Sequence, residues 1–153
     1  MASPSRVYFD TCALSRPFDD QSQARIRLEA EAVAHLLRAV DEGRLEWVSS
    51  DSDVVVFEVT RIPDEAQRES LLSLARRAGF TVPLSGEIGR RARVLRQQGL
   101  RDLDALHLAS AEATQAGVLI TTDQRFIRTA AGLNPASTVQ VKNPVVFEME
   151  AVQ

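Results

Sequence analysis

The chain has 153 residues, which suits one compact domain with a hydrophobic core and leaves little room for two. Hydrophobic residues make up 44% and charged residues 25%, and no apolar run approaches the roughly 20 residues that cross a bilayer, so no membrane span is expected. The net charge of −3 does not exclude a nucleic-acid partner, because a bound metal ion reverses the local sign of an acidic site.

The single cysteine, Cys12, excludes an internal disulfide and fits a reducing compartment. Residues 1–6 lack the charged and then apolar pattern of a signal peptide. We therefore expect a cytoplasmic protein.

Short β-branched runs alternate with longer amphipathic segments in the first half of the chain. The apolar run at 6–9 predicts a first strand, followed by a loop marked by Arg16-Pro17 and Asp19-Asp20. Apolar residues at helical spacing predict a long helix over 22–40, which ends before Gly43, and 45–49 reads as a second strand.

Residues 54–59 are ambiguous. Four valines and a phenylalanine favour a strand on propensity. The position of this segment after a strand and a cluster of N-cap candidates at 50–53 favours a short helix, which we predict.

The second half continues the alternation. The expected helices are 63–77, 85–98, 102–116 and 123–131, and the expected strands are 80–84, 118–121 and 138–141. Residues 145–153 are expected to form a C-terminal tail. Strands that alternate with helices predict a parallel sheet covered on both faces, and without any repeat or linker residues 1–153 are expected to form a single domain.

Two acids directly follow predicted strands, Asp10 after the first and Asp123 after the run at 118–121. In open α/β sheets, ligands bind beyond the carboxyl ends of the strands. Each acid alone is typical of a helix N-cap or a solvated turn. Two of them at one edge of a sheet indicate a shared cation site.

Two further acids lie in unusual surroundings. Glu58 falls within an apolar segment, where an unpaired carboxylate is costly, although one solvated face of an amphipathic element explains it equally well. Asp104 lies at the start of the helix over 102–116, where it would stabilise the helix electrostatically, but Asp102 can do the same.

The available ligands favour a hard cation. One cysteine and two histidines, His35 and His107, do not supply an ordinary zinc or iron site, whereas carboxylate oxygens select Mg²⁺ or Mn²⁺. We expect His107 to be a structural residue with satisfied hydrogen bonds, and His35 to lie at the surface or to serve packing.

Other enzyme and signalling classes fit poorly. Nucleotide-binding glycine loops and a nucleophile elbow are absent. A haloacid-dehalogenase-like phosphatase needs an acid where Cys12 stands. A phospho-receiver module remains a distant alternative on the strength of Lys142 and Pro144, but it leaves the Asp-Ala-Leu-His motif at 104–107 unexplained.

These residues resemble the PIN domain, the fold of VapC-type toxins and related nucleases, over nearly the whole chain. The matching motifs are Tyr-Phe-Asp-Thr at 8–11 with Arg-Pro-Phe-Asp-Asp at 16–20, then Glu58, Asp-Ala-Leu-His-Leu-Ala at 104–109 and Thr-Thr-Asp at 121–123. Each motif is weak alone, and all four in this order are specific.

The resemblance implies a three-layer α/β/α fold with a central parallel sheet of about five strands. It also implies a catalytic site of Asp10, Glu58, Asp104 and Asp123, with Mg²⁺ or Mn²⁺ held by the three aspartates and Glu58 either ligating the metal or orienting the attacking water.

The function that follows is a metal-dependent endoribonuclease that hydrolyses phosphodiester bonds in RNA, as the toxin of a VapBC-type pair with an antitoxin partner and as a homodimer. The alternatives are a PIN nuclease that processes RNA without being a toxin, and an inactive PIN scaffold that binds RNA or protein.

Overall fold

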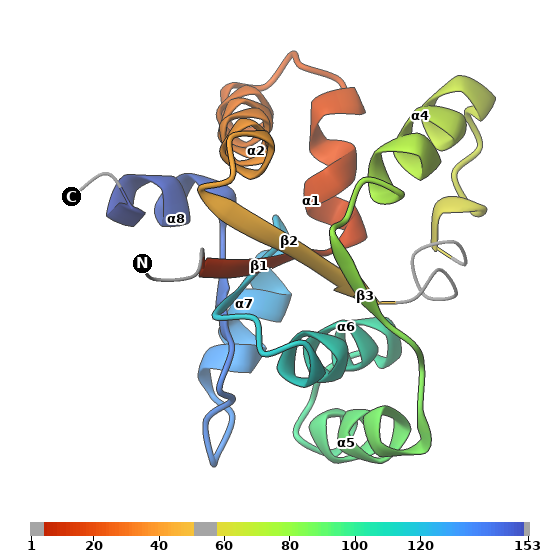
Figure 1. The fold of residues 1–153 in the computed structure, drawn as a ribbon, viewed down its shortest axis with the longest axis vertical. Coiled ribbons are helices and arrows are strands. Elements are labelled where there is room, and N and C mark those ends of the chain that lie inside the picture. Colours follow the sequence, from red (N-terminus) through yellow and green to blue (C-terminus); the bar gives the residue numbers. More distant parts are fainter. Residues whose placement is uncertain (1–4, 51–57, 152–153) are drawn as a thin grey trace.

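A computed structural model describes residues 5–50 and 58–151. Its strands form one five-stranded sheet in the order β3-β2-β1-β4-β5, and every neighbouring pair is parallel (Figure 1). The strands are β1 (Ser5–Phe9), β2 (Leu45–Ser50), β3 (Phe80–Val82), β4 (Val118–Ile120) and β5 (Gln140–Lys142). The expected parallel sheet of about five strands is therefore confirmed.

The three layers follow from the pleat of the central strands. Val7 and Phe9 of β1 belong to one apolar cluster, whereas Tyr8 between them belongs to the other. In β4 the same alternation separates Leu119 from Ile120. Because successive side chains point to opposite faces of a sheet, these short, fully buried strands require helices on both sides.

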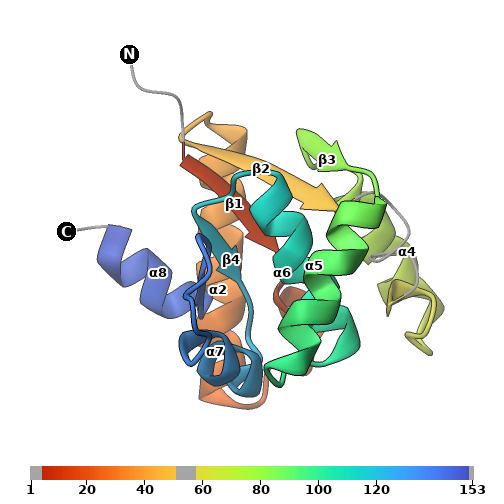
Figure 2. The same ribbon diagram turned by 90° about the horizontal axis from the view of Figure 1, so that it is seen from below.

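Helices cover both faces of the sheet. One cluster joins the sheet to α1 (Thr11–Ser15), α2 (Ala24–Asp41), α4 (Glu65–Ala75) and α8 (Pro144–Ala151). The other joins it to α5 (Gly86–Gln97), α6 (Asp102–Ala113) and α7 (Gln124–Ala131). Seen from below, α5, α6 and α7 lie in front of the sheet and α2 behind it (Figure 2). This is the expected α/β/α arrangement.

The segment after β1 differs from the expected loop. It forms α1 and then a 3₁₀ turn at Arg16–Phe18. Asp10 starts α1 as its N-cap, because its Oδ1 accepts a hydrogen bond of 2.9 Å from the Ala13 amide. A helix of five residues is too short to show a helical period in the sequence, which is why the prediction was wrong.

The expected helix over 102–116 ends earlier, at Ala113. Gln115 takes the left-handed conformation with φ of 59°, which is where a glycine would have been expected. The Thr114 hydroxyl caps this end by donating to the Ala111 carbonyl at 2.9 Å. Gly43 and Gly99, by contrast, follow α2 and α5 with positive φ, a conformation that glycine adopts readily.

Two further expectations concern 54–59 and the C-terminal tail. Most of 54–59 lies outside the described residues, whereas Glu58 and Val59 are helical. The expected tail is α8 as far as Ala151, and it is held because Phe147 packs against the cluster beneath α2. No helix in the described ranges has the length and apolarity needed to cross a membrane.

The strand order creates a switch point beside β1. The chain moves outward from β1 through β2 to β3, and then returns to place β4 on the other side of β1 and β5 beyond it. Ligand sites of open α/β sheets form beyond the carboxyl ends of strands at such a point. The residues after β1 and β4 therefore lie where a ligand is expected.

Candidate active site at the carboxyl edge of the sheet

Asp10 is the first residue beyond β1. Its backbone amide donates to the Ile120 carbonyl at 3.1 Å and so extends the pairing of β1 with β4 by one step. The side chain is 2% exposed, and capping of α1 uses its Oδ1 atom. The capping role and the site role are therefore compatible, because a carboxylate has a second oxygen.

Asp123 lies three residues beyond β4 and caps α7. Its Oδ1 accepts hydrogen bonds from the amides of Arg125 and Phe126, at 2.9 and 3.2 Å. Its Oδ2 lies 3.7 Å from the Arg101 guanidinium in a long ion pair. As with Asp10, the capping role that the sequence suggests is confirmed, and in Asp123 it uses only the Oδ1 atom.

Thr121 connects the ends of β1 and β4. This fully buried residue accepts a hydrogen bond of 3.1 Å from the Asp123 amide through its Oγ1, and its side chain also hydrogen-bonds Asp10. The threonine thereby fixes the turn after β4 relative to the residue that ends β1.

Asp104 and Asp102 share the first turn of α6 but have different surroundings. Asp104 is half-buried and is electrostatically coupled to Asp123, His107, Arg101 and Glu58. The Asp102 side chain is 76% exposed and pairs with Arg96 at 2.6 Å. The helix start therefore presents one acid to the other site carboxylates and one to a surface arginine.

Glu58 is held by two hydrogen bonds to the same oxygen. The Thr11 hydroxyl donates to Glu58 Oε1 at 2.8 Å, and His107 Nε2 lies 2.5 Å from that atom. The other ring nitrogen of His107, Nδ1, lies 2.7 Å from the Tyr8 hydroxyl. The acid that the sequence left most ambiguous thus lies at the end of a chain of buried polar groups.

The ionisation of these groups reflects burial and crowding. Burial raises the pKa of Asp10 from 3.8 to about 7, against the opposing effects of His107, Thr121 and the Ala13 amide. Burial and then the charge of Asp123 raise the pKa of Asp104 to about 6. A cation at this edge would offset the unfavourable energy that both shifts express.

The histidine and glutamate form a favourable pair. Burial opposes the charged form of His107, but the hydrogen-bonded oxygens of Tyr8 and Glu58 outweigh it and raise the pKa of the imidazole well above its ordinary value. Burial likewise opposes the carboxylate of Glu58, yet hydrogen bonds from His107 and Thr11 lower its pKa.

All four predicted acids act on one neighbouring side chain, Cys12. Desolvation by the surrounding protein raises the pKa of its thiol, and the charges of the acids raise it further; in order of effect these are Asp10, Glu58, Asp123 and Asp104. Asp10 and Asp123, which are 113 positions apart in the sequence, thus contribute to the same electrostatic field at Cys12.

The donor set fits a hard divalent cation by its chemistry, since it consists of carboxylate oxygens. Within 5–50 and 58–151, no three His, Cys, Asp or Glu side chains already converge into a metal-binding cluster. Mg²⁺ seldom requires one, because it keeps several waters and is commonly held by one or two carboxylates with substrate phosphates. The metal site with three aspartate ligands stays a prediction.

Sequence reasoning missed most of the supporting residues. Tyr8, Thr11 and Thr121 appeared only as members of the motifs that resemble the PIN domain, and no role was assigned to them. Arg101 was not singled out at all. His107 was expected to be structural with satisfied hydrogen bonds, and it is indeed buried and doubly bonded, but one of its partners is a predicted site residue.

A second buried polar cluster surrounds Glu29 of α2, which is 2% exposed. Its Oε1 accepts from Arg16 at 2.9 Å, and its Oε2 accepts from Asn143 at 2.5 Å and Arg25 at 3.3 Å. Arg25 also donates to the Thr122 carbonyl at 3.2 Å. The cluster therefore joins the segment after α1, helix α2 and the turns after β4 and β5.

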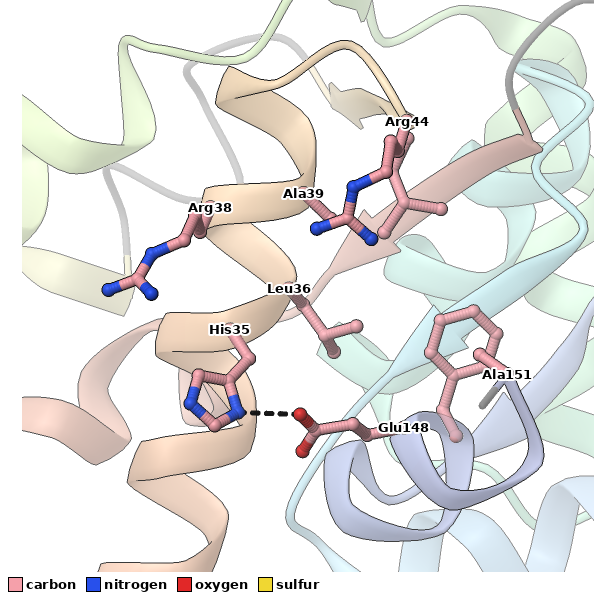
Figure 3. Close-up of a pocket in the computed structure, with 9 residues that line it drawn as sticks. His35, Leu36, Arg38, Ala39, Arg44, Glu148 and Ala151 are labelled. Carbon is pink, nitrogen blue, oxygen red and sulfur yellow. Dashed lines mark hydrogen bonds and ion pairs between the residues drawn. The ribbon is translucent and has the colours of Figure 1, made fainter. Parts of the chain in front are cut away.

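A cavity of about 440 Å³ lies between α2 and α8 at the opposite edge of the sheet. It is lined by apolar side chains such as Leu36 and by the hydrogen-bonded side chains of His35 and Glu148, whose Nδ1 and Oε1 atoms lie 2.6 Å apart (Figure 3). Leu45, which also lines it, pairs with Ser5 at the start of β1, far along the strand from Asp10. This cavity is separate from the carboxylates.

Comparison with known proteins agrees with this architecture. The sequence profile of the PIN domain matches residues 7–132. Among curated proteins, none matches the sequence.

Solved structures share the fold at low identity. FitAcB from Neisseria gonorrhoeae is 16% identical, with 90% of this chain and 97% of that chain covered and a TM-score of 0.57. VapBC2 from Rickettsia felis, bound to a DNA fragment from its promoter, is 15% identical over 90% and 98%, with a TM-score of 0.59. VapBC-1 from nontypeable Haemophilus influenzae is 17% identical over 91% and 98%, with a TM-score of 0.55. Since the profile spans most of the chain and the fold recurs in these structures, the chain belongs to the PIN domain family, whose members are generally nucleases.

Proposed function

We propose that this protein is an endoribonuclease that depends on Mg²⁺ or Mn²⁺ and hydrolyses phosphodiester bonds in RNA. The observation that carries the proposal is the shared field of Asp10, Glu58, Asp104 and Asp123 around Cys12 at the switch point of the sheet. Family membership supports nuclease chemistry, and the carboxylate donors support a hard cation.

In the proposed reaction, the acidic side chains and Arg101 have different roles. A bound divalent ion would lower the pKa of a water and neutralise phosphate charge. Asp10, Asp104 and Asp123 would hold the ion, and Glu58 would bind it or orient the attacking water. Arg101, half exposed beside Asp123, offers its guanidinium to a phosphate of the substrate.

We further propose that the protein acts as the toxin of a toxin–antitoxin pair. The support is the fold shared with FitAcB and with two VapBC proteins, one of which was solved with a fragment of promoter DNA. In this proposal an antitoxin protein is the partner, and the active form is a homodimer.

The decisive experiment measures cleavage of a single-stranded RNA with Mg²⁺, with Mn²⁺ and with EDTA. We expect cleavage by the wild type with either metal, and at least about a 100-fold loss in Asp10→Asn and Asp104→Asn, since outer-shell partners of metal sites alone cost 10–100-fold. Asp102→Asn is the matched control, because it removes a neighbouring acid from the same helical turn.

Different outcomes point to different errors. Undiminished cleavage in EDTA would reject the metal mechanism. Binding of RNA by the wild type without cleavage would favour the inactive scaffold. An equal loss in Asp102→Asn and Asp104→Asn would show that the assignment of acids on α6 is wrong.

A further inference from the structure

We propose that Tyr8, His107 and Thr11 are positioning residues that fix the carboxylate of Glu58 for the reaction. The inference rests on the proposed nuclease function and deepens it, because it assigns a role to three side chains that the proposed set of four catalytic acids leaves out. Each comes from a different element, β1, α6 and α1, and all three converge on Glu58.

The hydrogen bonds define one orientation of Glu58. His107 Nε2–H donates to Oε1, and the Thr11 hydroxyl donates to the same atom. The other ring nitrogen of His107, Nδ1, is hydrogen-bonded to the Tyr8 hydroxyl at 2.7 Å, so both ring nitrogens have a partner. Within the described residues no hydrogen bond reaches Oε2, which leaves that oxygen for a metal ion or water.

Burial distinguishes the supporting groups from the group they support. Tyr8 is 0% and His107 1% exposed, whereas the Glu58 side chain is 21% exposed. Buried polar chains of this kind add little stability over apolar packing of the same volume. The hydrogen bonds of Tyr8 and His107 lead to one partly exposed carboxylate, that of Glu58. Holding this carboxylate in a fixed orientation explains them better than a contribution to stability does.

The test is a double-mutant cycle on kcat with the full chain and Mn²⁺. We expect His107→Leu, which keeps the volume and removes the donor, to lower kcat by about 10- to 100-fold with KM little changed. In the Glu58→Gln background the same substitution should cause no further loss, because a positioning residue acts only through its target. Tyr8→Phe should give a smaller loss.

Two matched variants separate positioning from folding. His107→Gln restores a side-chain donor and should recover much of the lost rate. Ser110→Ala is the control, since Ser110 is fully buried on the same helix and its Oγ has no hydrogen-bond partner in the described structure. It should leave kcat unchanged.

A second readout does not depend on activity. The chain has only two histidines, so the imidazole N–H protons are readily assigned by NMR in metal-free protein. We expect a slowly exchanging, downfield His107 N–H signal that disappears in His107→Leu and moves in Glu58→Gln.

The experiments distinguish failure of the positioning role from failure of the nuclease proposal. If the wild type cleaves RNA but the losses of His107→Leu and Glu58→Gln multiply in the double mutant, the positioning role is wrong. If the wild type does not cleave, the nuclease proposal fails, and absence of the downfield signal then also overturns the hydrogen-bonded chain.

Discussion

The Asp10 side chain caps α1 and is also a proposed metal ligand, and one carboxylate can serve both roles because it has two oxygens. Its Oδ1 caps α1, and the carboxylate is also buried among other acids. For a single aspartate after a strand, capping is the ordinary explanation, and here it is correct. Capping alone does not require that Asp10 be only 2% exposed. It also does not require that three other carboxylates act, as Asp10 does, on the electrostatic potential at Cys12.

This burial predicts the pH dependence of stability. Between an unfolded pKa of 3.8 and a folded pKa of about 7, the folded chain binds the Asp10 proton more tightly, so stability falls as pH rises. We expect the metal-free protein to lose about 2–3 kcal/mol from this residue between pH 5 and pH 8. Urea unfolding in EDTA at both pH values measures it.

Asp10→Asn isolates the contribution of Asp10 from that of His107. The raised pKa values of His107 and Asp104 also make stability fall with rising pH, whereas the lowered pKa of Glu58 acts only in more acidic solution. The variant should therefore be more stable than the wild type at pH 8 and have a shallower pH profile. An unchanged profile would mean that Asp10 is not desolvated.

At the scale of elements, α2 anchors the carboxyl edge through Glu29. The helix joins the segment after α1 through Arg16, the turn after β5 through Asn143 and the Thr122 carbonyl through Arg25. These contacts give Arg16, the first residue of the Arg-Pro-Phe-Asp-Asp motif at 16–20, a structural role: it connects the segment before the long helix to that helix.

Loss of the Glu29 carboxylate should destabilise the fold. Removing one partner of a buried ion pair leaves the others uncompensated, so Glu29→Gln is expected to lower the free energy of unfolding by about 3 kcal/mol. Glu31→Gln, on the exposed face of the same helix, is the control and should change it little. Equal unfolding midpoints in urea for the two variants would contradict the anchoring role.

At the scale of the whole molecule, the strand order decides where the acids meet. Asp10 and Asp123 follow β1 and β4, which are neighbours in the sheet although more than one hundred residues separate them in the chain. Asp10 and Asp123 each cap a helix that begins at this edge, α1 and α7. The Asp123 side chain is 23% exposed there, so the group of acids reaches solvent.

The toxin proposal predicts a phenotype of the whole protein. Induction of the wild-type gene in bacteria should slow growth, because RNA cleavage would stop protein synthesis, whereas Asp104→Asn at equal abundance should not. Growth curves with matched immunoblots test this. Equal growth of both strains would remove the toxin assignment and leave the nuclease proposal standing.

Local rules account for what could be predicted. Strand runs, helical periods and Gly43 are signals within a few residues, and they were sufficient for the α/β class and for placing Asp10 and Asp123 after strands. The same rules failed for α1 and for the end of α6, where a five-residue helix and a left-handed glutamine leave no periodic trace.

The sequence by itself determined the fold class and the positions of Asp10 and Asp123 after strands, because both depend on patterns of neighbouring residues. The resemblance of its short motifs to the PIN domain added Glu58 and Asp104. Only the tertiary structure decided the strand order, the Glu29 cluster and the partners of Glu58. Tyr8 and His107 are 99 positions apart, and Glu29 and Asn143 are 114 apart. Hydrogen bonds over such separations depend on how the elements pack together, and a single sequence carries no local record of that packing.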